Sequence, residues 1–146
     1  MKKTILIDGF INKDSIVYLK KYFSVILSKE KNKKMLLSKI HKADAIILKT
    51  TQLTNNDLDK AKKLKIISRF GVGYDNLDLT YLKKKGINLR ITANSNKITV
   101  AEHVFFMMLF LSKQGLKNDN LARKRIFNED KIFFGKDLFG SNILIF

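Results

Sequence analysis

Short apolar runs that alternate with longer lysine-rich segments constrain the fold of this chain more than any other feature. The runs, each as long as a buried strand, lie at residues 4–7, 23–27, 45–48, 64–67 and 87–91. The segments between them have apolar side chains at helical spacing and cover residues 14–22, 33–42, 55–63 and 77–85. Strands that alternate with helices predict βαβ units. We therefore expect an α/β fold, with an open parallel sheet and helices on both of its faces.

Length and composition narrow the classes of protein that remain. A chain of 146 residues can bury one good core. It contains no cysteine, which excludes disulfides and thiolate chemistry, and its two histidines, His41 and His103, are far apart, so we predict no metal site. The longest uncharged apolar run, residues 104–111, is well short of the roughly 20 residues that cross a bilayer. Residues 4–7 are also too few for a signal peptide, so we expect a soluble, cytoplasmic protein with no membrane segment.

The net charge of +16 keeps nucleic acid and small anions among the possible ligands. Of the 29 basic residues, however, 25 are lysine, and they are spread over most of the predicted elements. Nucleic-acid grooves favour arginine forks and aromatic platforms. The lysines, with abundant Ile, Asn and Phe and no proline, also match the codon bias of an A/T-rich genome. We therefore favour a solvated basic surface over a nucleic-acid site.

The last third of the chain has a different pattern. Thr99 and Glu102 have the spacing of a capping box, which predicts a helix from Thr99 to about Lys113. Apolar side chains surround nearly all of this helix, which is typical of a helix buried in a larger core or a subunit interface. After a polar stretch at residues 114–124, the apolar run at residues 143–146 predicts a further strand. We therefore expect the chain to end within a second α/β unit.

Three polar turns follow predicted strands, at Asp8-Gly9, Lys49-Thr50-Thr51 and Gly71-Val72-Gly73. Ligands of open parallel sheets bind at this carboxyl edge. The third turn invites comparison with the dinucleotide fingerprint, but Asn76 stands at the third glycine position and residues 91–97 contain no acid. What remains is a turn whose amides can approach an anion, with a turn that binds nothing as the alternative.

The polar residues 94–97, just before the capped helix, form a second candidate anion site or a plain connection. Glu102 is most simply a cap residue and His103 a packed or surface histidine, because no base or nucleophile lies near them in sequence. We therefore name no catalytic residue. The residues by themselves predict an α/β domain that binds a small anion.

Two longer blocks of sequence resemble a known family. Residues 64–78 contain GVGYDNLD and residues 96–103 read NKITVAEH; their order and spacing are more specific than any single motif. Together with residues 43–47 they resemble the D-isomer-specific 2-hydroxyacid dehydrogenases, of the phosphoglycerate dehydrogenase type. Weaker similarity covers the whole chain, including residues 136–141, which resemble the lead-in to the family's cofactor domain.

This resemblance implies a flavodoxin-like substrate domain over residues 1–98. Residues 99–146 would then be a linker helix and the first strand of an incomplete Rossmann domain. The implied enzyme transfers a hydride between NAD, with NADP as the alternative, and the 2-carbon of a small 2-hydroxy or 2-keto acid. The intact enzyme would be a homodimer.

The resemblance also assigns roles to five residues. The backbone amides of Val72 and Gly73 would hold the substrate carboxylate, and Lys49 would meet a distal anionic group of the substrate. Asn96 would orient the substrate, and Val100 would lie against the nicotinamide of the cofactor.

The chain departs from the family pattern at two places. It has Ile91-Thr92-Ala93 where the family has an Asn-Thr-Pro turn. Phe146 falls one residue before the expected glycine-rich loop, and the catalytic Arg, Glu and His of the family lie beyond it; His103 does not correspond to that histidine. We therefore expect no turnover by this chain alone. The alternatives are a non-catalytic small-anion-binding module and, ranked last, a basic nucleic-acid-binding domain.

Overall fold

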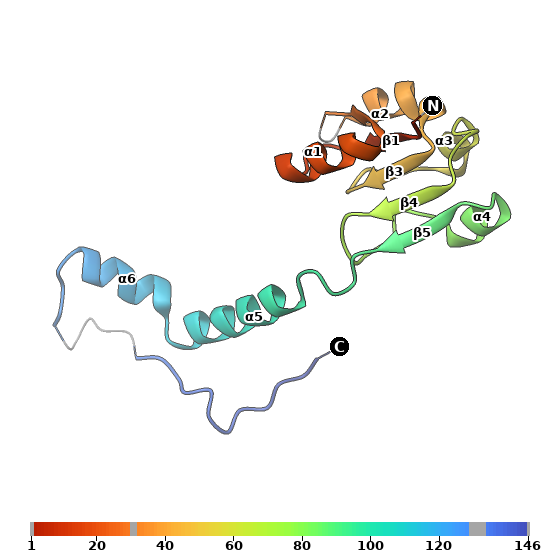
Figure 1. The fold of residues 1–146 in the computed structure, drawn as a ribbon. Helices are drawn as coiled ribbons and strands as arrows, with labels where there is room; N and C mark the ends of the chain where they lie inside the picture. The colour runs from red at the N-terminus through yellow and green to blue at the C-terminus, as the bar shows by residue number, and fades with distance from the viewer. Residues whose placement is uncertain (1, 30–31, 129–133, 146) are drawn as a thin grey trace. The chain divides into compact units, whose positions relative to one another are not determined.

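A computed structural model describes residues 2–29, 32–128 and 134–145 of the chain. The chain divides into two compact units, Met1–Ser95 and Asn96–Phe146, which we call unit 1 and unit 2. Unit 1 contains a sheet with helices, and the described part of unit 2 contains two helices (Figure 1).

Unit 1 is built on five parallel strands in the order β2-β1-β3-β4-β5. They are β1 (Thr4–Ile7), β2 (Ser24–Leu27), β3 (Ala45–Leu48), β4 (Ile66–Arg69) and β5 (Asn88–Ile91). The predicted α/β fold with an open parallel sheet is confirmed. The fourth strand begins two residues later than its apolar run, because the Leu64 N–H donates to the oxygen of Ala61, 3.0 Å away, in the turn before the strand.

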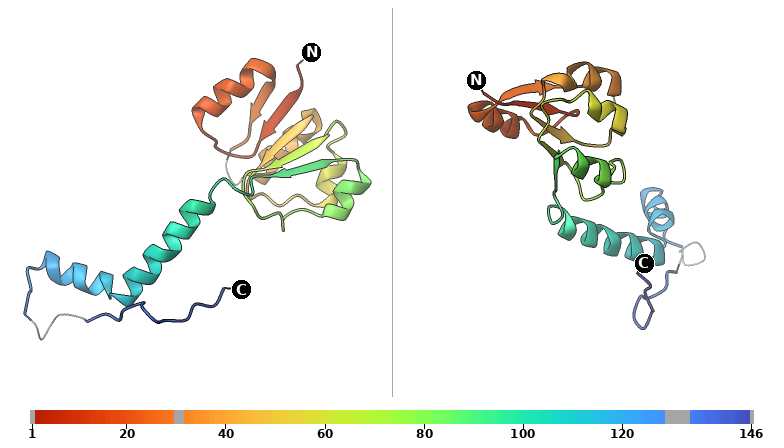
Figure 2. Two further views of the ribbon diagram at one scale, coloured as in Figure 1. Left: turned by 60° about the horizontal axis from the view of Figure 1, so that its bottom comes forward. Right: turned by 90° about the vertical axis from the view of Figure 1, so that its right-hand side faces the viewer.

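Helices cover both faces of this sheet (Figure 2). The helical elements are α1 (Lys13–Tyr22), α2 (Lys33–Lys39), the 3-10 helix η1 (Ile40–Lys42), α3 (Asn55–Asp59) and α4 (Leu79–Lys84). Along β1, Ile5 and Ile7 pack with residues of α1, whereas Leu6 packs with residues of α2, α3 and α4. Alternate side chains of a strand point to opposite faces, so one short apolar run contributes to both halves of the core.

The helices of unit 1 begin at polar caps that were readable in the sequence. Thr54 and Asp57 form a capping box at the start of α3. The Asp57 carboxylate also pairs with Lys33 of α2, 2.7 Å away, and so joins two helices. At α4 the Asp78 carboxylate accepts the backbone N–H of Tyr81, 3.0 Å away.

Unit 2 contains α5 (Lys97–Ser112) and α6 (Gly115–Arg123). The predicted capping box at Thr99 and Glu102 is wrong, because α5 begins two residues earlier and both side chains lie inside it. The backbone N–H of Val100 donates to the oxygen of Asn96, 2.9 Å away, so the first helical turn closes on Asn96, which is the N-cap residue. The polar stretch after α5 forms α6, which we had not predicted.

The strand predicted for residues 143–146 is also not observed. Residues 143–145 have no regular secondary structure, and Phe146 lies outside the described residues. A strand needs a neighbouring strand for its hydrogen bonds, and no other strand is present in the described part of unit 2.

Burial differs sharply between the two units. All buried residues among those described lie in unit 1, and every described side chain of unit 2 is at least partly exposed. Among the described helices, none combines the length and the apolar character that a membrane-spanning segment requires.

Candidate functional site

A buried carboxylate joins two of the three predicted polar turns. Asp8 follows β1 directly and is only 2% exposed. Its carboxylate accepts the backbone N–H groups of Lys49 (3.0 Å) and Thr51 (3.2 Å) and the Thr51 hydroxyl (2.9 Å). Asp8 therefore fixes the loop after β3 at the carboxyl edge of the sheet.

Asn76 ties the third turn to the same edge. Its side-chain Nδ2 donates to the backbone oxygen of Thr51, 3.0 Å away. Asn76, which stands at the third glycine position of the dinucleotide fingerprint, therefore connects two loops. Neither role was predicted from the sequence; the available signal for Asp8 was a lone acid directly after the apolar residues Ile5, Leu6 and Ile7.

The glycine turn is shaped by Gly71. Its φ of +146° lies in a region that other residues rarely adopt, and a Cβ there would come within 3.1 Å of Nη1 of Arg69. The Gly71 N–H donates to the hydroxyl of Thr92 (3.0 Å), and the Gly71 oxygen accepts the N–H of Thr92 (3.2 Å). Thr92 thus anchors the turn.

The next two backbone amides in this turn are exposed. Val72 is 44% exposed, and Gly73 is also exposed. Within the described residues, neither amide donates a hydrogen bond. Successive unused N–H groups in a glycine turn form a site where an anion can bind.

Lys49 lies beside the start of the same turn. The backbone N–H of Phe70 donates to the oxygen of Leu48 (2.8 Å), and the Lys49 ammonium lies 5.8 Å from the centre of the Phe70 ring. The structure therefore places a cation and two exposed amides on neighbouring segments of one edge. This arrangement can attract and orient a small carboxylate.

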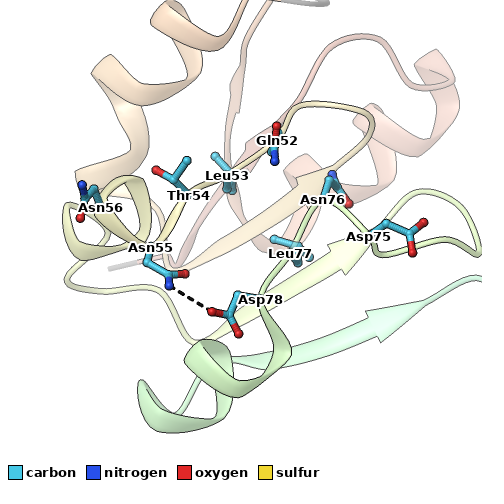
Figure 3. A pocket seen from close by; sticks show the side chains of 9 residues that line it. All are labelled: Gln52, Leu53, Thr54, Asn55, Asn56, Asp75, Asn76, Leu77 and Asp78. Atoms are coloured by element: carbon cyan, nitrogen blue, oxygen red, sulfur yellow. Dashed lines mark hydrogen bonds between the residues drawn. The ribbon is translucent and has the colours of Figure 1, made fainter.

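A polar hollow of about 480 Å³ adjoins the turn (Figure 3). Residues 52–56 line one side of it and residues 75–78 the other. Asn55 Nδ2 donates to the Asp78 carboxylate at 3.0 Å. This bond, together with one from the N–H of Tyr81, holds the pKa of Asp78 below its ordinary value. The carboxylate of Asp78 in its lining makes the hollow unfavourable for anions, so the turn is the better carboxylate site.

The other two predicted residues belong to unit 2. Asn96 is the N-cap residue of α5 and is exposed, and its side chain makes no capping hydrogen bond. Val100, 51% exposed, lies one turn further along, and its N–H donates to the Asn96 oxygen at 2.9 Å. The five predicted residues therefore form two groups: Lys49, Val72 and Gly73 in unit 1, and Asn96 and Val100 in unit 2.

No group of three or more His, Asp or Glu side chains that could hold a metal ion is found in the ranges that the structure describes. His103 is exposed and lies 6.0 Å from the Phe106 ring on the same helix, measured between ring centres.

Comparison with known proteins supports the resemblance of the two sequence blocks. The chain is 31% identical over 140 residues to a D-3-phosphoglycerate dehydrogenase of Methanocaldococcus jannaschii, covering 95% of this chain and 26% of that protein. It is 27% identical to a glyoxylate reductase of Pyrococcus furiosus, covering 98% of this chain and 46% of that one. The chain therefore spans between about a quarter and about half of these relatives.

Solved structures agree with the sequence comparison. The crystal structure of D-lactate dehydrogenase from Aquifex aeolicus, complexed with NAD and lactic acid, superimposes with a TM-score of 0.79 at 30% identity. The match covers 92% of this chain and 41% of that chain. The sequence model of the D-isomer specific 2-hydroxyacid dehydrogenase catalytic domain matches residues 5–134. This chain is a member of the D-isomer specific 2-hydroxyacid dehydrogenase family.

Proposed function

We propose that this chain is the substrate-binding part of an oxidoreductase that transfers a hydride between NAD and the 2-carbon of a D-2-hydroxy acid. NADP is the alternative cofactor, and we place the enzyme in the cytoplasm. The observation that carries the proposal is the pair of exposed, unused amides at Val72 and Gly73, in a chain that matches the family over residues 5–134. The relatives named above act on 2-hydroxy or 2-keto acids, as their names state.

In this proposal the amides of Val72 and Gly73 donate to the substrate carboxylate. Hydrogen bonds to a charged acceptor are about twice as strong as those between neutral groups, so two of them suffice to orient a small acid. Lys49 attracts a second anionic group when the substrate has one. Because lysine is a point charge and not a bidentate fork, it accepts either a phosphate or a carboxylate there.

Asn96 and Val100 have the other two proposed roles. The Asn96 amide, which makes no capping bond, is available to orient the substrate. Val100 presents an exposed apolar side chain that fits the nicotinamide side of the cofactor. When bound, NAD supplies the hydride acceptor or donor. The residues of this chain bind and orient the acid.

We also propose that the 146-residue chain does not turn over alone. The proton-transferring His, with its Glu, and the electrophilic Arg of the family correspond to positions beyond Phe146, and loss of such groups lowers rates by orders of magnitude. The measurement is nicotinamide absorbance with D-3-phosphoglycerate or glyoxylate as substrate. Steady turnover by the purified chain would contradict this part of the proposal.

The carboxylate site is tested by removing one amide proton. Val72→Pro deletes the N–H, and Val72→Ala keeps it while shortening the side chain. We expect Val72→Pro to weaken glyoxylate binding by about tenfold or more and Val72→Ala to leave it nearly unchanged. Binding is followed by NMR titration of the backbone amides. Equal affinities of the two variants would exclude this role. If glyoxylate binds, and NAD does not change the glyoxylate affinity of a longer version of the chain, the non-catalytic small-anion-binding module is favoured.

Lys49 is tested by comparing two ligands. Lys49→Ala should weaken binding of D-3-phosphoglycerate by about tenfold and that of glyoxylate much less, because glyoxylate has no second anionic group. The control Lys13→Ala removes the same charge at another position and should change the binding of neither ligand. If Lys49→Ala weakens both equally, the residue acts on the carboxylate or on the loop and not on a distal group.

The last part of the proposal is a homodimer formed through α5. Eight large apolar side chains of this helix are exposed: Ile98, Val100, Val104, Phe105, Phe106, Met107, Leu109 and Leu111. Such a surface is typical of an interface. Phe105→Glu should shift the chain towards monomer in sedimentation velocity, whereas Asn120→Glu on α6 should not. A chain that is monomeric before either change would refute the dimer.

A further inference from the structure

The opposite edge of the sheet in unit 1, where the strands begin, carries a cluster of lysines. A hollow of about 370 Å³ there is lined by Lys2, Lys3, Thr4, Lys42, Asp44, Lys63 and Lys65. These residues come from the first residues of the chain and β1, from the end of η1 and its connection to β3, and from the connection between α3 and β4. We call the five lysines the lysine edge. Lysines that are far apart in sequence are thus adjacent in the fold.

The one carboxylate in this hollow does not cancel its charge. Asp44 accepts the N–H of Thr4 at 2.8 Å and lies 3.4 Å from the Lys3 ammonium. The hydrogen bond from Thr4 and the charge of Lys3 hold the pKa of Asp44 below its ordinary value. Asp44 is therefore ionised and satisfied by its own neighbours, and the lining keeps a surplus of positive charge.

Helix dipoles explain only part of this cluster. Lys42 lies in the last turn of η1, where a cation is favourable. Lys63 and Lys65 lie outside any helix, in the connection before β4. Gathering like charges in one place costs free energy through repulsion, which a bound polyanion would relieve.

An exposed aromatic residue follows directly the two backbone groups that Lys2 of the lysine edge contacts. The Lys2 ammonium donates to the backbone oxygens of Lys20 (3.2 Å) and Lys21 (3.0 Å) at the end of α1, directly before Tyr22. Tyr22 is 57% exposed, and its ring makes T-shaped contacts with Tyr18 and Phe23, at centre-to-centre distances of 5.4 and 6.5 Å. An exposed ring next to phosphate-binding cations is a platform on which a nucleobase can stack.

We propose that the lysine edge and Tyr22 bind single-stranded nucleic acid, with the lysines contacting phosphates and Tyr22 stacking on a base. Lysine is a point charge and the edge contains no arginine fork, so the site reads the backbone and not the sequence. Stacking requires an unpaired base, which favours a single strand over a duplex. The site lies at the opposite end of the strands from Val72 and Gly73 and does not depend on the proposed hydroxy-acid function. The spread of the lysines along the sequence argued against such a site, but the fold brings five of them together at one edge of the sheet.

The experiment measures binding of a labelled oligouridylate of about 12 nucleotides to the full 146-residue chain, by fluorescence anisotropy over a salt series. The test variant is Lys42→Gln/Lys63→Gln/Lys65→Gln. The matched control, Lys13→Gln/Lys34→Gln/Lys124→Gln, removes the same charge from exposed positions outside the edge. Circular dichroism confirms that both variants fold.

We expect the test variant to lose at least about tenfold in affinity at low salt, with a log–log salt slope smaller by about 2, and the control to lose much less. Tyr22→Leu should weaken binding by about tenfold and leave the salt slope unchanged. Equal losses in the two triple variants would show that net charge alone binds the oligonucleotide, which overturns the site. The assignment to nucleic acid is overturned if Tyr22→Leu binds the oligonucleotide with unchanged affinity and inorganic polyphosphate competes as well as RNA does.

Discussion

Unit 1 and unit 2 are both rich in apolar residues, yet only unit 1 buries them among the residues described. In unit 1, runs of four strand residues supply both faces of a sheet, and helices cover each face. In unit 2, α5 is apolar on all sides but remains exposed along its length. Hydrophobicity alone therefore does not produce a core. A core also requires a second layer against which the apolar surface can pack.

The same comparison applies to the two groups of candidate site residues. Lys49, Val72 and Gly73 lie on loops held by the buried Asp8 and by Asn76. Asn96 and Val100 lie on the first turn of a helix with no buried residue among those described. We therefore expect the carboxylate site to be ordered by unit 1 itself. The four pairs of changes below test the contrast between the two units.

The largest expected difference is between two leucines. Leu6 is fully buried in the sheet, whereas Leu111 of α5 is 68% exposed. Leu6→Ala should lower the free energy of unfolding by about 3–4 kcal/mol through lost burial and the cavity left behind. Leu111→Ala should change it by less than about 0.5 kcal/mol. Urea unfolding followed by circular dichroism measures both, and equal effects would show that unit 2 has a core of its own.

Two carboxylates form the next pair. Asp8→Ala leaves two amides and one hydroxyl without their buried acceptor, and should cost about 3 kcal/mol of stability. Asp137 of unit 2 pairs with Lys113 on the surface, so Asp137→Ala should have no measurable effect. The same urea titrations apply. Because Asp8 fixes the loop after β3, glyoxylate binding should weaken in Asp8→Ala as well; unchanged binding would show that unit 1 orders its site without this carboxylate.

Acid should destabilise unit 1 through Asp57. Burial raises the pKa of this carboxyl, but hydrogen bonds from Lys33 and Thr54 outweigh burial and hold the pKa below its ordinary value. A lowered pKa in the folded state gives stability that is present above the unfolded value, near 3.9, and is lost as the pH falls through the folded value.

Asp57→Asn should therefore cost about 1 kcal/mol at neutral pH, through the weakened capping box, and less at low pH. Thermal unfolding between about pH 2 and pH 7 measures the difference, with Asp119→Asn on α6 as the control in unit 2. A loss that is the same at every pH would mean that the ionised carboxylate is not what stabilises α3.

The smallest effect concerns the start of α6. Gln114 has a φ of 53°, in the left-handed region that favours glycine. Gln114→Gly should stabilise the helices of unit 2 by about 0.5 kcal/mol, whereas Asn120→Gly inside α6 should destabilise them by a similar amount. Helix content by circular dichroism, or amide hydrogen exchange of α6, reports the change. A loss of helix in Gln114→Gly would show that the side chain stabilises this turn by a contact that glycine lacks.

Local pattern predicted the elements of unit 1 well, because strands and helices there follow the spacing of their own side chains. It failed in unit 2 for two different reasons. Thr99 and Glu102 have the residue types of a capping box, but the helix begins at Lys97, with Asn96 as its N-cap residue, so both lie inside it. The apolar run at residues 143–145 has strand composition, but pairing requires a partner strand that local sequence does not specify.

The sequence alone was therefore enough for the α/β class, the parallel strands and the glycine turn, since each depends on periodicity or on a residue type at one position. Tertiary structure was needed to reveal Asp8 as the buried acceptor for two loop amides, Asn76 as a tie between loops, and the lysine edge. Each of these joins segments separated by twenty or more residues. Contacts of that range are set by the order of strands in the sheet and by its two layers of helices, and no local pattern encodes them.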